Sequence, residues 1–148
     1  MACRRRSLIV SCVLLGLLPG CFLKGAPEPV PVTAEQQVFY SDDSHWPEEA
    51  AVVIRDAEDW SLWWERLTGS SENRPRVDFD SSMLLLFNAG KRYPGDRIQI
   101  EELVPGDGAL VARYRLDESG VQGSEVYPVQ VVRVRRRSDP IRFERVSS

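Results

Sequence analysis

Two pairs of neighbouring carboxylates are the residues best suited to acid–base chemistry: Asp78 with Asp80, and Glu101 with Glu102. Asp78 and Asp80 flank Phe79, so in an extended segment they share one face while Phe79 points to the core. Glycosidases use two carboxyl groups, but these normally come from separate parts of a cleft. The spacing therefore favours the start of a strand. An enzyme that acts on glycans, with Asp78 and Asp80 or Glu101 as acids, stays as an alternative.

His45 is the only histidine, and it follows Ser41-Asp42-Asp43-Ser44. A single histidine does not supply a typical zinc site, and the acids beside it lack the glycine and the spacing of a calcium-binding EF-hand loop. A Ser-His-Asp triad would have to use it, yet the chain has no Gly-x-Ser-x-Gly motif. We interpret His45 as a solvated loop residue, and we expect no catalytic residue, no metal and no cofactor.

The segment from Gly90 to Arg97 is rich in glycine and basic residues. It lacks the Gly-Lys-Ser/Thr ending of a phosphate-binding loop, and no helix is expected after it. We expect a turn between two strands. The functional alternative is a bent loop that presents its side chains to a partner protein. The candidate partner-binding residues are Lys91, Arg92, Tyr93, Gly95 and Arg97.

A second basic cluster contains Arg133, Arg135, Arg136 and Arg137. Arg133 and Arg135 share one face of a strand. The chain as a whole has a net charge of −3. That acidic balance argues against a nucleic-acid partner. We interpret the cluster as a solvated face, with contact to an acidic partner or to lipid phosphates as the alternative.

The N-terminus has the features of an export signal. Three arginines, Arg4 to Arg6, precede the uncharged apolar stretch Ser7 to Leu18. That stretch is shorter than the roughly 20 apolar residues of a transmembrane helix. The following Leu18-Pro19-Gly20-Cys21 resembles a lipobox, which implies cleavage before Cys21 and acylation of its thiol and its new amine. We therefore predict a lipoprotein anchored in a membrane through Cys21.

Cysteine usage agrees with this prediction. The three cysteines are Cys3, Cys12 and Cys21, so residues 22–148 contain none. A domain without cysteine forms no disulfide and has no thiol nucleophile. Removal of residues 1–20 leaves 128 residues and lowers the net charge from −3 to −6. This length suits one domain with a sizeable core.

We expect residues 21–35 to be a lipidated, proline-rich tether, because three prolines and a glycine favour an extended chain there. Phe22, rather than Asp, follows Cys21. In a Gram-negative host we therefore predict the periplasmic face of the outer membrane. The tether would hold residues 36–148, a single domain, near the membrane surface.

One helix is expected at about residues 57–68. Asp56 is a suitable N-cap and Gly69 a suitable C-cap. Trp60, Trp63 and Trp64 fall with Leu67 on one face, at positions i, i+3, i+4 and i+7. Such a face must be buried, and a sheet is the obvious partner.

Seven segments have the composition or alternation of strands, and the turns between them are too short for βαβ crossovers. The sequence therefore predicts an α+β fold: a mostly antiparallel, curled or barrel-like sheet of six or seven strands packed on one helix. The expected strands are residues 36–40, 50–54, 83–87, 97–104, 110–116, 126–134 and 141–146.

Three blocks, taken in order, resemble the C-terminal domain family of the protease-complex subunit PrcB. They are Val53-Ile54-Arg55-Asp56-Ala57-Glu58-Asp59-Trp60 with Leu62-Trp63, then Val77-Asp78-Phe79 with Met83-Leu84-Leu85-Leu86-Phe87 and Gly90-Lys91-Arg92, and Val126-Tyr127-Pro128-Val129-Gln130-Val131-Val132. The family commonly has Thr-Gly-Gly-Tyr where this chain has Tyr93-Pro94-Gly95-Asp96. This departure implies that, if the loop carries binding, its partner here differs or is absent.

The resemblance implies an envelope domain without established catalysis that helps to assemble or stabilise a surface protease in one lineage. The leading hypothesis is thus a non-catalytic lipoprotein that binds a partner protein of the cell envelope. A second hypothesis is a protease inhibitor that uses the Gly90–Arg97 loop and the turn after Leu116. An enzyme acting on envelope glycans is the third.

Overall fold

The computed structural model describes residues 28–147, which form eight strands, one α-helix and one short 3-10 helix. The expected signal segment and Cys21 lie outside the described residues. The helices are η1 (Ala34–Gln36) and α1 (Ala57–Thr68). The strands are β1 (Val30–Pro31), β2 (Gln37–Ser41), β3 (Glu49–Ile54), β4 (Ser82–Ala89), β5 (Arg97–Pro105), β6 (Leu110–Asp117), β7 (Val129–Arg135) and β8 (Ile141–Arg145).

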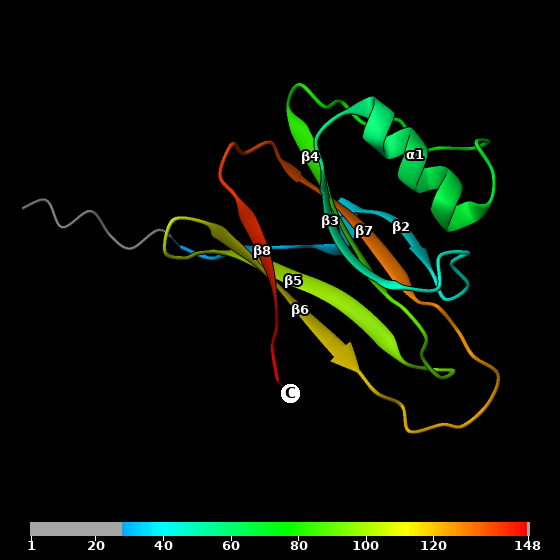
Figure 1. Cartoon of the computed structure of the whole chain (residues 1–148). Helices are drawn as coiled ribbons and strands as arrows, with labels where there is room; N and C mark the ends of the chain where they lie inside the picture. The colour runs from blue at the N-terminus through cyan, green and yellow to red at the C-terminus, as the bar shows by residue number, and fades with distance from the viewer. Residues whose placement is uncertain (1–27, 148) are drawn as a thin grey trace, which may run out of the picture.

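The strands form two four-stranded sheets, in the orders β1-β5-β6-β8 and β2-β7-β4-β3 (Figure 1). Every pair of neighbours is antiparallel except β6 and β8. The α+β class, the antiparallel character and the single α-helix are therefore confirmed for residues 28–147.

The expected curled or barrel-like sheet is confirmed only in part, because residues 28–147 form two open sheets, each with two edge strands, and no closed barrel. The chain crosses from one sheet to the other four times, after β1, β4, β6 and β7. The expected count of six or seven strands is also too low, because residues 28–147 form eight. The seven expected segments correspond to β2 to β8, and β1 is additional.

The additional strand β1 lies within the segment expected to be a tether. Val30 and Pro31 pair with Leu103 and Glu102 at the edge of β5. A proline lacks the N–H needed in a central strand, so an edge is where it is tolerated. Val32 N donates to Glu101 O at 2.6 Å and extends this contact. The chain from Val30 onward is thus attached to the body of the domain.

The helix α1 has the boundaries and the buried face that its sequence predicts. Asp56 accepts a hydrogen bond from Asp59 N at 2.8 Å, and Gly69 takes the left-handed conformation at the C-cap. Trp60, Trp64 and Leu67 are buried against one face of the β2-β7-β4-β3 sheet. Trp63 is half-buried at the edge of this face.

The β2-β7-β4-β3 sheet is the middle layer of three, with α1 on one face and the second sheet on the other (Figure 1). Side chains of β4 alternate between these layers: Leu84 and Leu86 contact the helix cluster, whereas Met83, Leu85 and Phe87 belong to the core between the sheets. Burial on both faces explains why β4 is a continuous apolar run.

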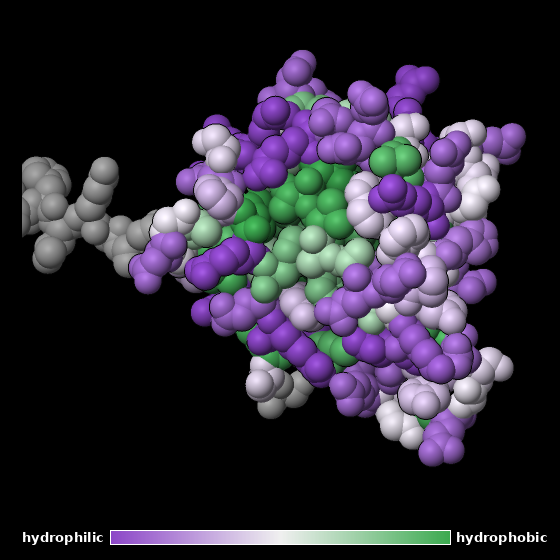
Figure 2. Space-filling model, viewed as in Figure 1, coloured by the Kyte–Doolittle hydropathy of each residue, from purple (hydrophilic) through white to green (hydrophobic). Residues whose placement is uncertain are grey.

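The core between the sheets reaches the surface between the edge strands β3 and β8. Figure 2 shows apolar side chains gathered over these strands. Val53, Ile141 and Phe143 are half-buried there and pack against the inner core. Among residues 28–147, no helix is both long enough and apolar enough to cross a membrane.

Candidate functional site

Two loops lie together at one end of the sandwich (Figure 1). The first, Gly90–Asp96, joins β4 to β5, and the second, residues 118–128, joins β6 to β7. Ser119 Oγ of the second loop donates to Pro94 O of the first at 2.7 Å. We call the surface formed by residues 90–97 and 118–125 the loop end. It contains all five residues that the sequence marked as partner-binding candidates.

A buried carboxylate fixes the two loops to each other. Asp96 is only 5% exposed. Its Oδ1 accepts hydrogen bonds from Ser119 N at 2.7 Å and Ser119 Oγ at 3.0 Å, and its Oδ2 accepts one from Tyr93 N at 3.2 Å. Burial alone would raise the pKa of Asp96, but these hydrogen bonds and the charge of Arg92 outweigh it, so the pKa lies below its ordinary value. The loop end is therefore tied together by an ionised group.

Two glycines allow the first loop to bend. Gly90 has φ +65°, and a Cβ there would lie 2.9 Å from Glu49 N. Gly95 has φ +88°, and a Cβ there would lie 3.1 Å from Ser119 Cβ. Side chains are disfavoured in this left-handed conformation. Of the candidate residues, Gly95 thus lets the loops approach rather than offering a side chain to a partner.

Three candidate side chains line one hollow of about 440 Å³: Lys91, Arg92 and Tyr93. Lys91 pairs with Glu125, whose hydrogen bond raises the pKa of the lysine. Arg92 Nη2 lies 3.5 Å from Glu49 Oε2. Such exposed pairs hold side chains only weakly. Tyr93 is 49% exposed and Val121, from the second loop, is 52% exposed, so the loop end presents two large apolar side chains.

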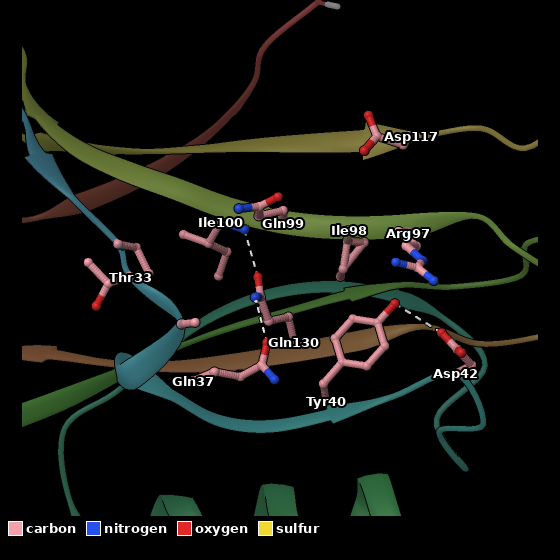
Figure 3. Close-up of a pocket in the computed structure, with 12 residues that line it drawn as sticks. Thr33, Gln37, Tyr40, Asp42, Arg97, Ile98, Gln99, Ile100, Asp117 and Gln130 are labelled. Carbon is pink, nitrogen blue, oxygen red and sulfur yellow. Dashed lines mark hydrogen bonds between the residues drawn. The ribbon is translucent and has the colours of Figure 1, made fainter.

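Arg97 lies apart from these three, in a groove of about 500 Å³ between β2 and β5 (Figure 3). Tyr40 and Asp42 line the same groove, and Tyr40 OH donates to Asp42 Oδ1 at 2.9 Å. Burial, followed by the Asp42 carboxylate, raises the pKa of Tyr40 to about 12, against the opposing charge of Arg97. The structure therefore divides the five candidates between a hollow and an adjoining groove.

Gln130 closes the floor of this groove. It is 7% exposed; its Oε1 accepts from Ile100 N at 2.6 Å, and its Nε2 donates to Gln37 Oε1 at 3.1 Å (Figure 3). Because β1 pairs only with Glu102 and Leu103, Gln130 satisfies a β5 amide that no neighbouring strand reaches. Sequence reasoning missed Tyr40, Asp42 and Gln130, although a glutamine inside the apolar run Val129–Val132 is a visible signal.

The carboxylates considered for acid–base chemistry take part in local contacts. Asp78 accepts from Asp80 N at 3.0 Å and from Ser81 Oγ at 2.7 Å, closing the turn before β4. The Ser81 hydroxyl is the main reason that the pKa of Asp78 is lowered. Ion pairs of 3.1 Å join two further pairs of residues on β5 and β6, Glu101 with Arg115 and Glu102 with Arg113.

His45 lies at the C-terminal end of α1. Its backbone N–H donates to Leu67 O at 2.9 Å, and its ring lies over Gly69, where a Cβ would come within 2.5 Å of Nδ1. The residue is exposed, as expected, and it also covers the helix terminus. Within residues 28–147, no group of three His, Cys, Asp or Glu residues is arranged to hold a metal ion.

Comparisons of this chain with protein-family models, with curated proteins and with solved structures gave no match. The resemblance of its three sequence blocks to the PrcB C-terminal domain family stays a prediction. Function is therefore argued from the geometry of the loop end.

Proposed function

We propose that this chain is a non-catalytic, lipid-anchored protein of the cell envelope that binds a partner protein through the loop end. The observation that carries the proposal is the Asp96–Ser119 contact, which helps to hold two loops in one arrangement while Tyr93 stays half exposed beside Lys91 and Arg92. A surface ordered before binding loses less conformational entropy on association. Tyrosine and arginine are also the residues that most often dominate binding energy.

Cross-linking in intact cells tests this use of the loop end. A photoreactive amino acid is placed at Tyr93 in one variant and at Leu62 in another. The two side chains are matched in exposure, at 49% and 47%, but Leu62 lies on α1. We expect one recurring protein adduct from position 93 and none from position 62. The same adducts from both positions, or no adduct from either, would contradict the proposal.

The membrane anchor is tested separately. Wild-type chain and Cys21→Ser are expressed in cells that are fed a clickable fatty acid, and the membranes are then fractionated. We expect label and membrane residence in the wild type and loss of both in the variant. In a Gram-negative host, the label is expected in the outer-membrane fraction. An unlabelled, soluble wild-type protein would remove the anchor from the proposal and leave partner binding to be judged by the cross-links.

A protease inhibitor is the second candidate function. It is favoured by one observation, that the Gly90–Arg97 loop and the turn after Leu116 adjoin through Ser119 and Pro94. Two adjoining loops at the end of a rigid sandwich suit insertion into an active-site cleft. We expect an inhibitor to block a cysteine or serine protease at micromolar concentration and Tyr93→Ala to weaken it. A panel without any inhibition rejects this candidate.

A further inference from the structure

The end of the sandwich opposite the loop end is basic. Here β7 leads through Arg136–Pro140 into β8, whose first residue Ile141 pairs with Leu110. Four arginines and one aspartate, with Ser81 and Ser138, line a hollow of about 610 Å³ that is open to solvent. Arg133 lies on β7 two residues before Arg135, and Arg142 is the second residue of β8. We call this surface the arginine end; its six arginines are Arg55, Arg133, Arg135, Arg136, Arg137 and Arg142.

The arginine end keeps its positive charge. None of the six arginines has a carboxylate oxygen within 4.0 Å among residues 28–147. The six ion pairs of this part of the chain involve other cations, on the loop end and on β6 and β8. The hollow itself is lined by four arginines and by Asp80 alone as an acid, a formal charge of +3 in a chain whose net charge is −3.

Backbone carbonyls hold two of these guanidinium groups. Arg136 Nη1 donates to Arg55 O at 2.8 Å and to Phe79 O at 2.5 Å. Arg55 Nη2 donates to Asp139 O at 3.1 Å. These contacts position the groups without neutralising them. Arg135 and Arg137 make no side-chain hydrogen bond to the described residues and are exposed, so they are available to an outside anion.

The chain enters the domain at this same end. Val30 pairs with Leu103, two residues before the end of β5, and Leu110 N after the β5–β6 turn donates to Pro140 O at 2.8 Å. In Figure 1 the described chain begins beside that turn, on the side away from the loop end. Figure 2 shows hydrophilic side chains over the nearby connection from β7 to β8.

We infer that the arginine end binds the phosphate-bearing headgroups of anionic lipids. This inference rests on the proposed anchor at Cys21: fully extended, the chain from Cys21 to Val30 spans at most about 30 Å. A tether of this length lets the basic end of an anchored domain reach the bilayer, where arginine is attracted within about a Debye length, ~10 Å. The loop end then points away from the membrane, toward a partner.

Vesicle co-sedimentation tests lipid binding without the anchor. The protein is the chain from residue 21 onward with Cys21→Ser; both hydrophobic clusters lie within residues 28–147, so it contains the folded body. We expect binding to phosphatidylcholine vesicles that contain phosphatidylglycerol, little binding to phosphatidylcholine alone, and a decline with added salt. Because each arginine near such a surface is worth roughly five-fold in binding, Arg135→Gln with Arg137→Gln should reduce binding by more than about tenfold.

A matched double variant provides the control. Arg113→Gln with Arg115→Gln removes the same charge from the outer face of β6, where both arginines are already paired with acids. It should retain most of the binding. Equal losses in the two double variants, or equal binding to neutral and anionic vesicles, would overturn the inference. Binding to polyglutamate but not to vesicles would also overturn it and assign the arginine end to an acidic protein.

The result of the vesicle assay does not depend on the proposed function, because the Cys21→Ser protein carries no acyl group and the assay contains no partner protein. If vesicle binding fails while fatty-acid labelling and the position-93 cross-link succeed, only the headgroup contact is lost. If labelling fails while vesicles bind the arginine end, the headgroup contact stands and the tethered orientation is lost.

Discussion

Asp96 and Ser119 lie 23 residues apart in the chain and form two hydrogen bonds, of 2.7 and 3.0 Å, between the two loops of the candidate site. The Asp96 carboxylate therefore helps to fix the arrangement of Tyr93 and its neighbours, together with the backbone bridge between Arg92 and Val126 of the same two loops. Since both loops contain many exposed residues, the order of the loop end depends on these polar contacts more than on apolar packing.

Asp96→Asn should destabilise the protein by about 1.5–3 kcal/mol at neutral pH, because hydrogen bonds to an ionised acceptor are lost. Since folding lowers the pKa of Asp96, its contribution is present above the ordinary carboxyl pKa and lost as the pH falls through the lowered value. The difference between wild type and variant in urea unfolding should therefore shrink below about pH 4. Asp107→Asn, in an exposed turn, is the control. A difference that is constant with pH would show that ionisation plays no part.

Gly90→Ala should destabilise the protein by more than Gly108→Ala does. Both glycines have positive φ, +65° and +70°, so both substitutions carry a conformational cost of about 1–2 kcal/mol. Only at Gly90 would the added Cβ also collide with backbone, at 2.9 Å from Glu49 N; nothing lies within 4 Å of the Cβ at Gly108. Thermal unfolding of the two variants measures the difference. Equal shifts would mean that the backbone near Glu49 moves aside freely.

The sequence predicts a helix or strand correctly where all the residues that determine it lie in one short segment. The helix could be predicted because Asp56, the tryptophan spacing and Gly69 lie within one run of residues, and β4 because burial on both faces leaves it continuously apolar. The sequence did not predict which of the two sheets contains β4. The Gly90–Asp96 loop is short enough to join neighbouring strands of one sheet, yet it connects strands of different sheets.

The site was predicted only in part for a related reason. Local composition marked Lys91, Arg92 and Tyr93, and the structure places them in one hollow. The contact that orders them joins Asp96 to Ser119, and no pattern links two residues from separate turns. The sequence marked Gly95 as a partner-binding candidate, whereas in the structure Gly95 lets the two loops approach closely enough for the Asp96–Ser119 contact. The parallel pairing of β6 with β8 could not be predicted either, because it depends on β7 lying in the other sheet.

Gln130→Leu should destabilise the protein by about 1–3 kcal/mol, since it leaves the buried Ile100 N–H without its acceptor. The exposed Gln122, replaced in the same way, should change stability by less than about 0.5 kcal/mol. Hydrogen exchange gives a local readout: the Ile100 amide should lose protection in Gln130→Leu and keep it in Gln122→Leu. Unchanged protection at Ile100 would show that another group replaces the glutamine.

Two leucines of α1 provide a test of how the helix is attached. Leu67 is 1% exposed in the cluster between α1 and the sheet, whereas Leu62 is 47% exposed. Leu67→Ala should cost about 2–5 kcal/mol, because it removes buried methyl groups and leaves a cavity. Leu62→Ala should cost about 0.5 kcal/mol or less, because alanine is a good helix former and little apolar surface is lost. Denaturant unfolding followed by tryptophan fluorescence measures both values, since Trp60 and Trp64 lie in the same cluster. Similar values for the two variants would mean that α1 does not pack on the sheet through the face described.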